Sequence, residues 1–225
     1  MKLLTLLCCS LLVIPLYAGY IVDTNLDTAD ANIGDGICDD GTGSCSLRAA
    51  IQEGNVTPGT CIIMFNVAPG NPTVYTLTSN LPSITGDIVI SGTVPDEIII
   101  DGSMMFSAFS ITGGSTTQIV GLTIQNTDGA ISSAVNSVSG SITIENCRIN
   151  NARSSAFGGA ISNAINSSMQ IQSTIITNCT TTSTVGGGGI GSSGILFIDG
   201  TTISDCNAPV RGGAIYNNDS FLDIT

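Results

Sequence analysis

The sequence predicts an all-β fold, a parallel β-helix with a short capping helix near its N-terminus. Three observations carry this prediction. The chain repeats itself with a period of about 25–30 residues, which is typical of stacked repeat architectures. Short apolar runs alternate with Gly, Pro, Asn and Asp, as in chains built from strands and turns. After Gly54 the sequence has no amphipathic segment of helical length.

The repeat is clearest at residues 158–179, GGAISNAINSSMQIQSTIITNC. It returns at 187–206, begins again at Gly212 and has a looser forerunner at 128–147. From the Ile of the Gly-rich corner to the Cys, the three copies span 16, 18 and 16 residues, whereas the spacing from each Cys to the next such Ile is 14, 11 and 9. The corner residues counted in this way are Ile131, Ile161, Ile190 and Ile215. We expect the nearly constant arc to form the wall of the solenoid and the variable arc to be an outward loop, where changes of length cost little.

The residues at the end of each copy are predicted to stack on successive coils ~4.8 Å apart. Three positions before the end lies an inward apolar residue that would build the core: Ile124, Ile144, Ile176 and Ile203. One position before the end lies a small polar residue that would supply hydrogen bonds where the backbone leaves the strand: Asn126, Asn146, Asn178 and Asp205. The last position is a corner, occupied by Thr127, Cys147, Cys179 and Cys206. Parallel side-chain directions there favour unbonded packing of the cysteines over disulfides.

The Gly-rich corner at the start of each copy has a separate predicted role. Glycine permits positive φ and the close passage of a neighbouring backbone, after which the chain re-enters the core. The glycines expected to act in this way are Gly159, Gly189 and Gly213.

Residues 1–18 read as a secretory signal peptide, with Lys2, an apolar run from Leu3 to Tyr17, and cleavage expected after Ala18. The rival interpretation is a membrane anchor, but this run is shorter than the ~20 residues needed to span a bilayer. We therefore expect an exported chain with an N-terminal cap at 19–60 and a β-helix at 61–225. The last copy stops within a predicted strand, so the β-helix is expected to be truncated and to lack its anchoring module.

An acidic stretch follows a short strand expected at Tyr20–Thr24. In an oxidising compartment Cys38 and Cys45 would close a small loop there by a disulfide. Carboxylates with a spacing similar to that of calcium-binding loops are Asp27, Asp30, Asp35, Asp39 and Asp40. The EF-hand spacing is not met, and two interpretations stay open: a calcium site, or a solvated turn region fixed by the disulfide. No other cofactor is expected.

The segment CSLRAAIQEGN predicts a short helix from Leu47 to Glu53, with Ser46 as the N-cap and Gly54 as residue C′. Its apolar face would consist of Leu47, Ala50 and Ile51. A helix with one apolar stripe is expected to cover the first coil, and Arg48 to pair with a neighbouring Asp. Strand candidates then follow in the order CIIMFNV, TVYTLT, DIVISGT, EIIIDGS, FSITGG and TQIVGLTIQN.

The net charge argues against two classes of partner. The chain has 17 carboxylates, 5 cations and no His, for a net charge of −12. Binding to nucleic acid needs clustered Lys and Arg, and docking on anionic lipid needs a basic surface. Neither is expected.

Several segments carry a family resemblance. GDGICDDGTGSCSLRAAIQEGN closely resembles the CSLREA domain of exported bacterial proteins, although Ala49 stands where that family has Glu. LTSNLPSITGDIVISGT and VGLTIQNTDGAI resemble the segments that usually follow it. GGAISN and GGAIYN resemble the repeats of polymorphic outer-membrane proteins and related autotransporter passengers. The resemblance implies a single-stranded, right-handed, pectin-lyase-like β-helix, an extracellular or outer-membrane location and, for the outer-membrane members, an adhesive role.

Two function classes remain. We expect a non-enzymatic adhesin whose loops contact a surface protein or a glycan. The alternative is a polyuronate hydrolase or lyase, because Asn126-Thr127-Asp128 resembles a motif of polygalacturonases. Glycoside hydrolysis needs two carboxyl groups across the scissile bond, and lyase chemistry a cluster of cations. The other polygalacturonase motifs are missing, so an enzyme is the less favoured class, and its candidate residues would be Asp128, Glu145 and Arg148.

Overall fold

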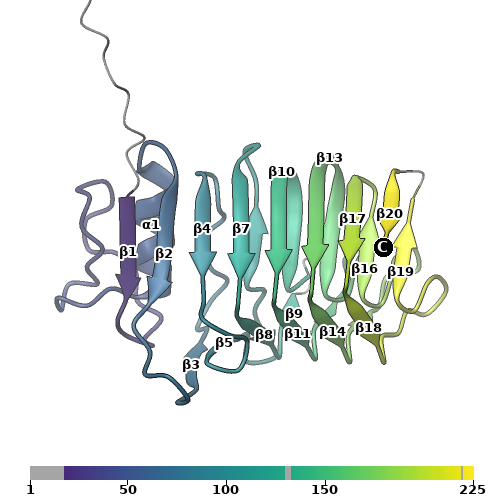
Figure 1. Ribbon diagram of the computed structural model, residues 1–225, viewed down its shortest axis with the longest axis horizontal. Coiled ribbons are helices and arrows are strands. Elements are labelled where there is room, and N and C mark those ends of the chain that lie inside the picture. The colour runs from purple at the N-terminus through teal and green to yellow at the C-terminus, as the bar shows by residue number, and fades with distance from the viewer. Residues whose placement is uncertain (1–17, 130–132, 219) are drawn as a thin grey trace, which may run out of the picture.

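The computed structural model describes residues 18–129, 133–218 and 220–225. The predicted signal peptide, apart from its last residue, and the corner residue Ile131 lie outside the described residues. The described chain forms a row of parallel coils, with β1 and α1 at one end and the C-terminus at the other (Figure 1). The predicted all-β parallel β-helix is therefore confirmed.

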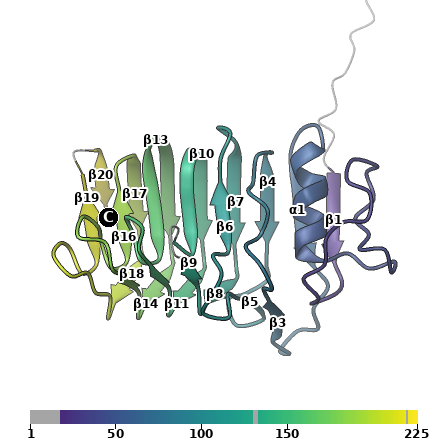
Figure 2. The same cartoon turned by 180° about the vertical axis from the view of Figure 1, so that it is seen from behind.

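Three parallel sheets make up the walls of the solenoid. The first sheet contains β1 (Ala18–Val22), β2 (Cys61–Phe65), β4 (Ile88–Ser91), β6 (Phe109–Ile111), β7 (Thr116–Val120), β10 (Val135–Glu145), β13 (Ile161–Gln172), β16 (Ile190–Ser192), β17 (Ile195–Asp199), β19 (Ile215–Asn217) and β20 (Leu222–Ile224). The second contains β3 (Thr73–Thr76), β5 (Ile98–Asp101), β8 (Thr123–Gln125), β11 (Arg148–Asn150), β14 (Ile175–Thr177) and β18 (Thr202–Ser204). The third contains β9 (Asp128–Gly129), β12 (Arg153–Ser154) and β15 (Thr180–Thr181). Figure 2 shows the side that carries β6 and β16.

Two aliphatic ladders fill the interior because register partners on successive coils point inward together. The ladder of the first sheet consists of Ile63, Ile90, Ile119, Ile144, Ile171 and Ile198. The ladder of the second sheet consists of Ile100, Ile124, Ile149, Ile176 and Ile203. All of them except Ile203 are buried, so each coil contributes apolar area from two walls to one continuous core.

The predicted stacking of copy ends is correct for three members and wrong for the fourth. Ile144 and Asn146 lie on the first sheet and the corner after it, whereas their supposed partners lie on the second sheet and its corner. The register partner of Ile124 is Ile149, and the residue that follows the second sheet in that coil is Asn151. The error arose because a Cys occupies a different corner in this coil, so Cys does not mark one fixed position of the repeat.

Both corners turn through left-handed backbone, which Gly and Asn adopt at the lowest cost. After the first sheet the residues with positive φ are Gly121, Asn146, Ser173 and Gly200. After the second sheet they are Asn126, Asn151, Asn178 and Asp205, with φ between 51° and 54°. The predicted polar turn residues thus mark two corners rather than one.

Helix α1 (Leu47–Val56) lies beside β1 and β2 and closes the N-terminal end of the core (Figure 1). Ser46 is its N-cap, as predicted, and its hydroxyl accepts a hydrogen bond from the Ala49 N–H. Gly54 is not residue C′, because the helix continues to Val56. A Cβ at Gly54 would lie 3.0 Å from Ile88 Cδ1 and 3.1 Å from Cys61 Sγ, so this glycine lets the helix pack closely against the first coils.

Strand β1 begins two residues earlier than the predicted strand at Tyr20–Thr24. It adds to the first sheet, where Tyr20 pairs with Ile63 of β2. The backbone N–H groups of Asp23 and Thr24 then donate to Cys45 O. The chain therefore leaves the sheet at Asp23 and turns to the disulfide loop.

Candidate functional site

A groove of about 550 Å³ runs over the outer face of the solenoid between β10 and β19. Its floor lies on an outward-facing column at one register, in which Asn136 of β10 pairs with Ser162 of β13. The column continues through Gly191 to Tyr216, which lie outside the lining. The Ser162 hydroxyl accepts a hydrogen bond from Gly158 N at 2.9 Å and lies 2.7 Å from Ser133 Oγ. The floor is therefore fixed to the glycine corner beneath it.

One side of the groove is a β-bulge in β13. Its residues Asn163 and Asn166 pair with Ser137 and Ser139 of β10, so two residues of β13 stand opposite one of β10. A bulge bends a strand and redirects its side chains. Here it turns Ile165 outward until its side chain is 76% exposed beside the groove.

A cluster of hydrogen bonds fixes this bulge from below. Ser167 Oγ donates to Ala164 O at 2.6 Å or to Asn163 Oδ1 at 2.5 Å. The Asn163 amide also donates to Ser192 Oγ and Ile195 O of the next coil. Both the oxygen and the nitrogen of the Asn163 side-chain amide therefore have partners, and Asn163 holds the bulge in place.

The other side of the groove is the loop that contains Ala156 and Phe157, part of the arc that varies in length between copies. A Cβ on Gly191 would lie 2.0 Å from Phe157 O, so only glycine lets this loop lie flat on the floor. The Phe157 ring meets the Tyr216 ring edge-on, with centroids 5.3 Å apart. The Arg211 guanidinium lies 4.8 Å from the Tyr216 centroid. These contacts fix Phe157 beside the groove.

A second hollow of about 240 Å³ lies on the N-terminal side and shares Asn136 with the groove. It is lined by residues that include Asn80, Ser83, Ser107 and Ser110. The two hollows meet at Asn136 and together follow the axis of the solenoid. None of the described residues that line either hollow carries an ionisable side chain.

Sequence reasoning placed binding in the variable arc, which supplies Phe157, but it did not identify Asn136 or Ile165. A signal for the bulge was present. The copy at 158–179 is two residues longer from corner Ile to Cys than the copy at 187–206. These two residues lie between Asn163 and Ser168, where four residues of β13 face two of the next coil.

The carboxylates named as calcium candidates accept hydrogen bonds from their own loops and the segments next to them. Asp30 accepts from the N–H groups of Asn32 and Asp39, and Asp39 from those of Gly41 and Gly43. Asp35, Asp40 and Asp27 are engaged in the same way by further N–H, hydroxyl or guanidinium groups. Among the described residues no group of three or more His, Cys, Asp or Glu side chains is arranged to hold a metal ion.

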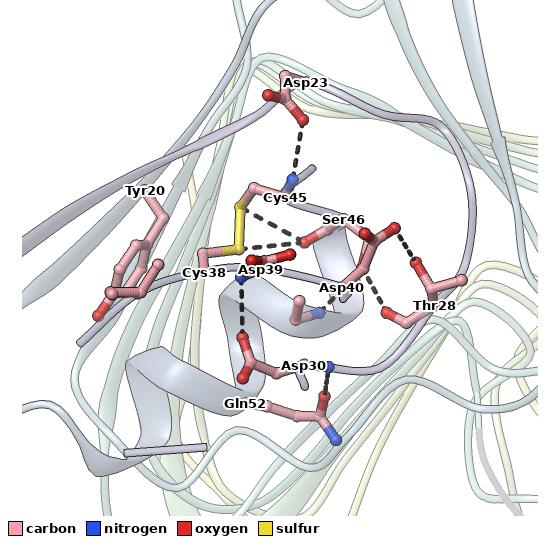
Figure 3. Close-up of a disulfide and its surroundings, with 12 residues drawn as sticks. Tyr20, Asp23, Thr28, Asp30, Cys38, Asp39, Asp40, Cys45, Ser46 and Gln52 are labelled. Atoms are coloured by element: carbon pink, nitrogen blue, oxygen red, sulfur yellow. Dashed lines mark hydrogen bonds between the residues drawn. A yellow bond between two sulfur atoms is a disulfide. The ribbon is translucent and has the colours of Figure 1, made fainter. Parts of the chain in front are cut away.

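The predicted disulfide between Cys38 and Cys45 is present, and Figure 3 shows the acidic turns around it. Asp23 Oδ1 accepts a hydrogen bond from Cys45 N at 2.8 Å, and Ser46 Oγ donates to Thr28 O. The disulfide therefore joins the acidic loop to the start of α1.

The three candidate catalytic residues lie on three different sheets. Asp128 is in β9 of the third sheet, where Arg153 Nη1 lies 3.9 Å from its Oδ2. Glu145 ends β10 of the first sheet. Arg148 is in β11 of the second sheet and forms an ion pair with Asp96. Each candidate residue therefore lies on a different wall of the solenoid.

The predicted glycine column needs one change of register. Gly158 forms a bridge with Gly187, so Gly188 is the partner of Gly159 and Gly189 stands where the other copies have Ala160 and Ala214. None of these corner glycines has positive φ. A Cβ at Gly159 would lie 2.0 Å from Gly188 O, so close passage alone accounts for glycine here.

Besides the disulfide pair, the described residues include four cysteines, and all four are free thiols. For Cys147, Cys179 and Cys206 this agrees with the expected unbonded packing. Cys147 lies at the corner after the first sheet, and Cys179 and Cys206 stack at the corner after the second. A hydrogen bond between these two lowers the pKa of Cys206 to about 7, although burial acts in the opposite direction. The same hydrogen bond, together with burial, raises the pKa of Cys179.

The corner after the second sheet carries an amide ladder. Asn126 Nδ2 donates to Asp101 Oδ2 at 2.8 Å, and Asn151 Nδ2 donates to Asn126 Oδ1 at 2.8 Å. Asn178 Nδ2 continues the series to Asn150 Oδ1 at 3.1 Å. The predicted role of Asn126 and Asn178 as hydrogen-bonding turn residues agrees with these contacts.

Two substitutions of Asn151 separate its side-chain bond from its backbone conformation. Asn151→Gly keeps the left-handed backbone and should lower the free energy of unfolding by ~1 kcal/mol through loss of the hydrogen bond. Asn151→Ala also strains the backbone and should cost about 1–2 kcal/mol more. Urea denaturation of both variants measures the difference, and equal losses would contradict the role of φ.

Among the described residues, no helix has the length and apolar character needed to cross a bilayer. A scan against protein-family models and a search of the curated proteins find no match to this chain.

Proposed function

We propose that the chain is an exported, non-enzymatic β-solenoid that binds a surface protein or a glycan through the outer face of its coils. The observation that carries this proposal is the groove. Its floor and bulge belong to strands of the solenoid wall, whereas Phe157 belongs to the arc that varies in length between copies. A rigid scaffold that presents variable loops is the usual arrangement of a binding protein.

Two features support export. The Cys38–Cys45 disulfide is of a kind that persists in oxidising compartments. The apolar run that follows Lys2 is typical of a secretory signal peptide. We place the chain outside the cell or at the bacterial outer surface, in line with its resemblance to CSLREA-domain proteins and outer-membrane repeats.

The placement of the candidate catalytic residues on three different sheets, outside the groove lining, supports a binding role over catalysis. Hydrolysis with inversion needs two carboxyl groups about 6.5–9.5 Å apart across the scissile bond. The Asp128 carboxylate instead lies beside Arg153 on the third sheet, away from the groove lining. An adhesive role requires only the groove and the loops around it.

Surface exposure and activity can be tested on the full chain. In a bacterial host the protein should be digested by protease added to intact cells, whereas a cytoplasmic marker should stay intact. Purified protein should bind to cells and leave polygalacturonate uncleaved. Retention inside the cell would contradict export. Cleavage that is lost in Asp128→Asn would establish the enzyme instead.

A further inference from the structure

We propose that the groove and the adjoining hollow bind an uncharged oligosaccharide that lies along the solenoid axis, with Asn136 at its centre. The proposal rests on the binding role above and specifies its ligand. Four features support it: the lining is uncharged, its side-chain amides have unused hydrogen-bonding groups, apolar side chains are exposed beside it, and the groove runs along the solenoid axis.

The lining has no charge in a protein that is otherwise strongly acidic. The net charge is −12, yet neither hollow is lined by a described ionisable side chain. An anionic ligand would be repelled by the protein as a whole and would find no cation in the lining to pair with. A cationic ligand would find no carboxylate there. The complementary ligand is therefore uncharged and forms hydrogen bonds.

Three side-chain amides along the groove and the adjoining hollow have hydrogen-bonding groups left for such a ligand. The Asn136 side chain has no hydrogen-bond partner among the described residues. Asn80 Oδ1 accepts from Ser107 N, and Asn218 Oδ1 accepts from Tyr216 OH, which leaves both NH₂ groups available. An amide both donates and accepts, as does a sugar hydroxyl, so the two groups are matched.

Apolar surface accompanies these amides. Ile165 is 76% exposed on the bulge, and the Phe157 ring is half-buried on the opposite side. Ligand sites typically combine apolar and aromatic side chains with a few polar groups that fix orientation. A pyranose ring offers both, with C–H groups on its faces and hydroxyls at its edge.

The direction of the groove along the solenoid axis favours an extended oligosaccharide over a single small molecule. Asn136 and its register partners lie on successive coils ~4.8 Å apart, so lining groups recur at that interval along the axis. An extended glycan presents its sugar units in a comparable series. A peptide that binds by strand addition needs a free strand edge, whereas the groove lies on the face of the sheet.

Calorimetric titration of the full chain with cellohexaose, mannohexaose and chitohexaose tests the proposal, with hexagalacturonate as the charged counterpart. At least one uncharged sugar should bind, and hexagalacturonate should bind at least about tenfold more weakly, because the lining offers no cation to offset its charges. Asn136→Ala should weaken binding about threefold to tenfold by removing a hydrogen-bonding group. Asn66→Ala, an exposed Asn outside the groove, should leave binding unchanged.

A second variant keeps the test independent of folding. Ile165 is exposed, so Ile165→Ala should fold normally and weaken sugar binding about threefold through lost apolar contact. The proposal is overturned if no uncharged sugar binds, if hexagalacturonate binds as tightly, or if neither variant changes the affinity. It is also overturned if an uncharged decapeptide binds more tightly than the sugars and depends on Asn136.

Failure of this inference is distinguishable from failure of the proposed function. Cell binding that neither the sugars nor Asn136→Ala affects would overturn the inference and leave the adhesive role intact. Sugar binding by a protein that stays inside the cell would support the inference and overturn the surface role.

Discussion

Replacing Gly158 with alanine should destabilise the solenoid by more than about 3 kcal/mol, as expected for a clash with buried backbone. A Cβ at this position would lie 1.7 Å from Ile161 O and 2.7 Å from Gly191 N. Both are backbone atoms, which cannot rotate away as a side chain can. Relief of the clash would therefore require the corner from Gly158 to Ile161 to open and the next coil, at Gly191, to move away.

Gly158 also connects three hydrogen bonds of the corner. Its N–H donates to Ser162 Oγ, and its carbonyl oxygen accepts from Ser154 Oγ at 2.6 Å and from Ser133 Oγ. Opening of the corner would weaken the bonds to Ser154 and Ser162, and separation from the preceding coil would weaken the bond to Ser133. The substitution is therefore expected to lower both stability and order in the floor of the groove.

Urea denaturation followed by circular dichroism measures this effect, with Gly19→Ala as the matched control. At Gly19 a Cβ would have one neighbour, Ile62 O at 3.8 Å, so the control should change the free energy of unfolding by less than about 1 kcal/mol. Similar losses in the two variants would show that close passage does not explain the glycine corner.

Replacing Arg48 with alanine should cost about 3–5 kcal/mol, the range found when one partner of a buried ion pair is removed. Arg48 Nε and Nη2 donate to the two Asp27 carboxylate oxygens at 2.9 and 2.8 Å. The same guanidinium donates to Ser79 O and Asn80 O. Because Asp27 also accepts from Thr78 N at 2.7 Å, this pair joins the acidic loop, α1 and the segment after β3.

Arg148→Ala is the control, because it breaks an ion pair at the surface. The side chains of Arg148 and Asp96 are 40% and 74% exposed, against 11% and 5% for Arg48 and Asp27. Exposed pairs contribute about 1 kcal/mol or less. Comparable losses of stability in the two variants would contradict the proposed role of burial.

The Arg48–Asp27 pair also predicts a pH dependence. Burial alone would raise the pKa of Asp27, but hydrogen bonds from Arg48 and Thr78 outweigh it and lower the pKa below the ordinary value. A lowered folded-state pKa stabilises the protein above the unfolded pKa of about 3.9, and this contribution is lost as the pH falls through the folded value. Asp27→Asn should therefore lose less stability than the wild type between pH 5 and pH 3. If the free energy of unfolding fell equally with pH in Asp27→Asn and in the wild type, this role of Asp27 would be contradicted.

The sequence alone was sufficient to predict the class of fold. Apolar residues alternate within short runs, so their inward direction follows from the two-residue period of a strand. Glycine-rich corners and a recurring length then imply stacked coils. The N-cap at Ser46, the Arg48 pair and the disulfide could also be predicted, because each depends on residues close in sequence or on a chemical type with few partners.

The register between coils was harder to predict from the sequence, because it depends on which residues of successive copies face each other in space. Asn146 and Asn126 share a local pattern and a left-handed backbone, yet they lie at different corners. Gly188 and Gly189 lie in a run of four glycines, so only their distance from Ile190 distinguishes them in the sequence. The pairing of Ile161 with Ile190 fixes the register of the glycines, whereas the corner of Asn146 is resolved only by the backbone hydrogen bonds between coils.

The sequence by itself determined the repeat, its inward aliphatic residues and the positions at which the backbone must turn. Only the tertiary structure decided where a ligand could bind. Asn136, Phe157 and Ile165 come from two coils and from three local settings, a regular strand, a loop and a bulge. They form one groove because stacking fixes the coils in register, and no pattern within a single copy specifies that neighbour relation.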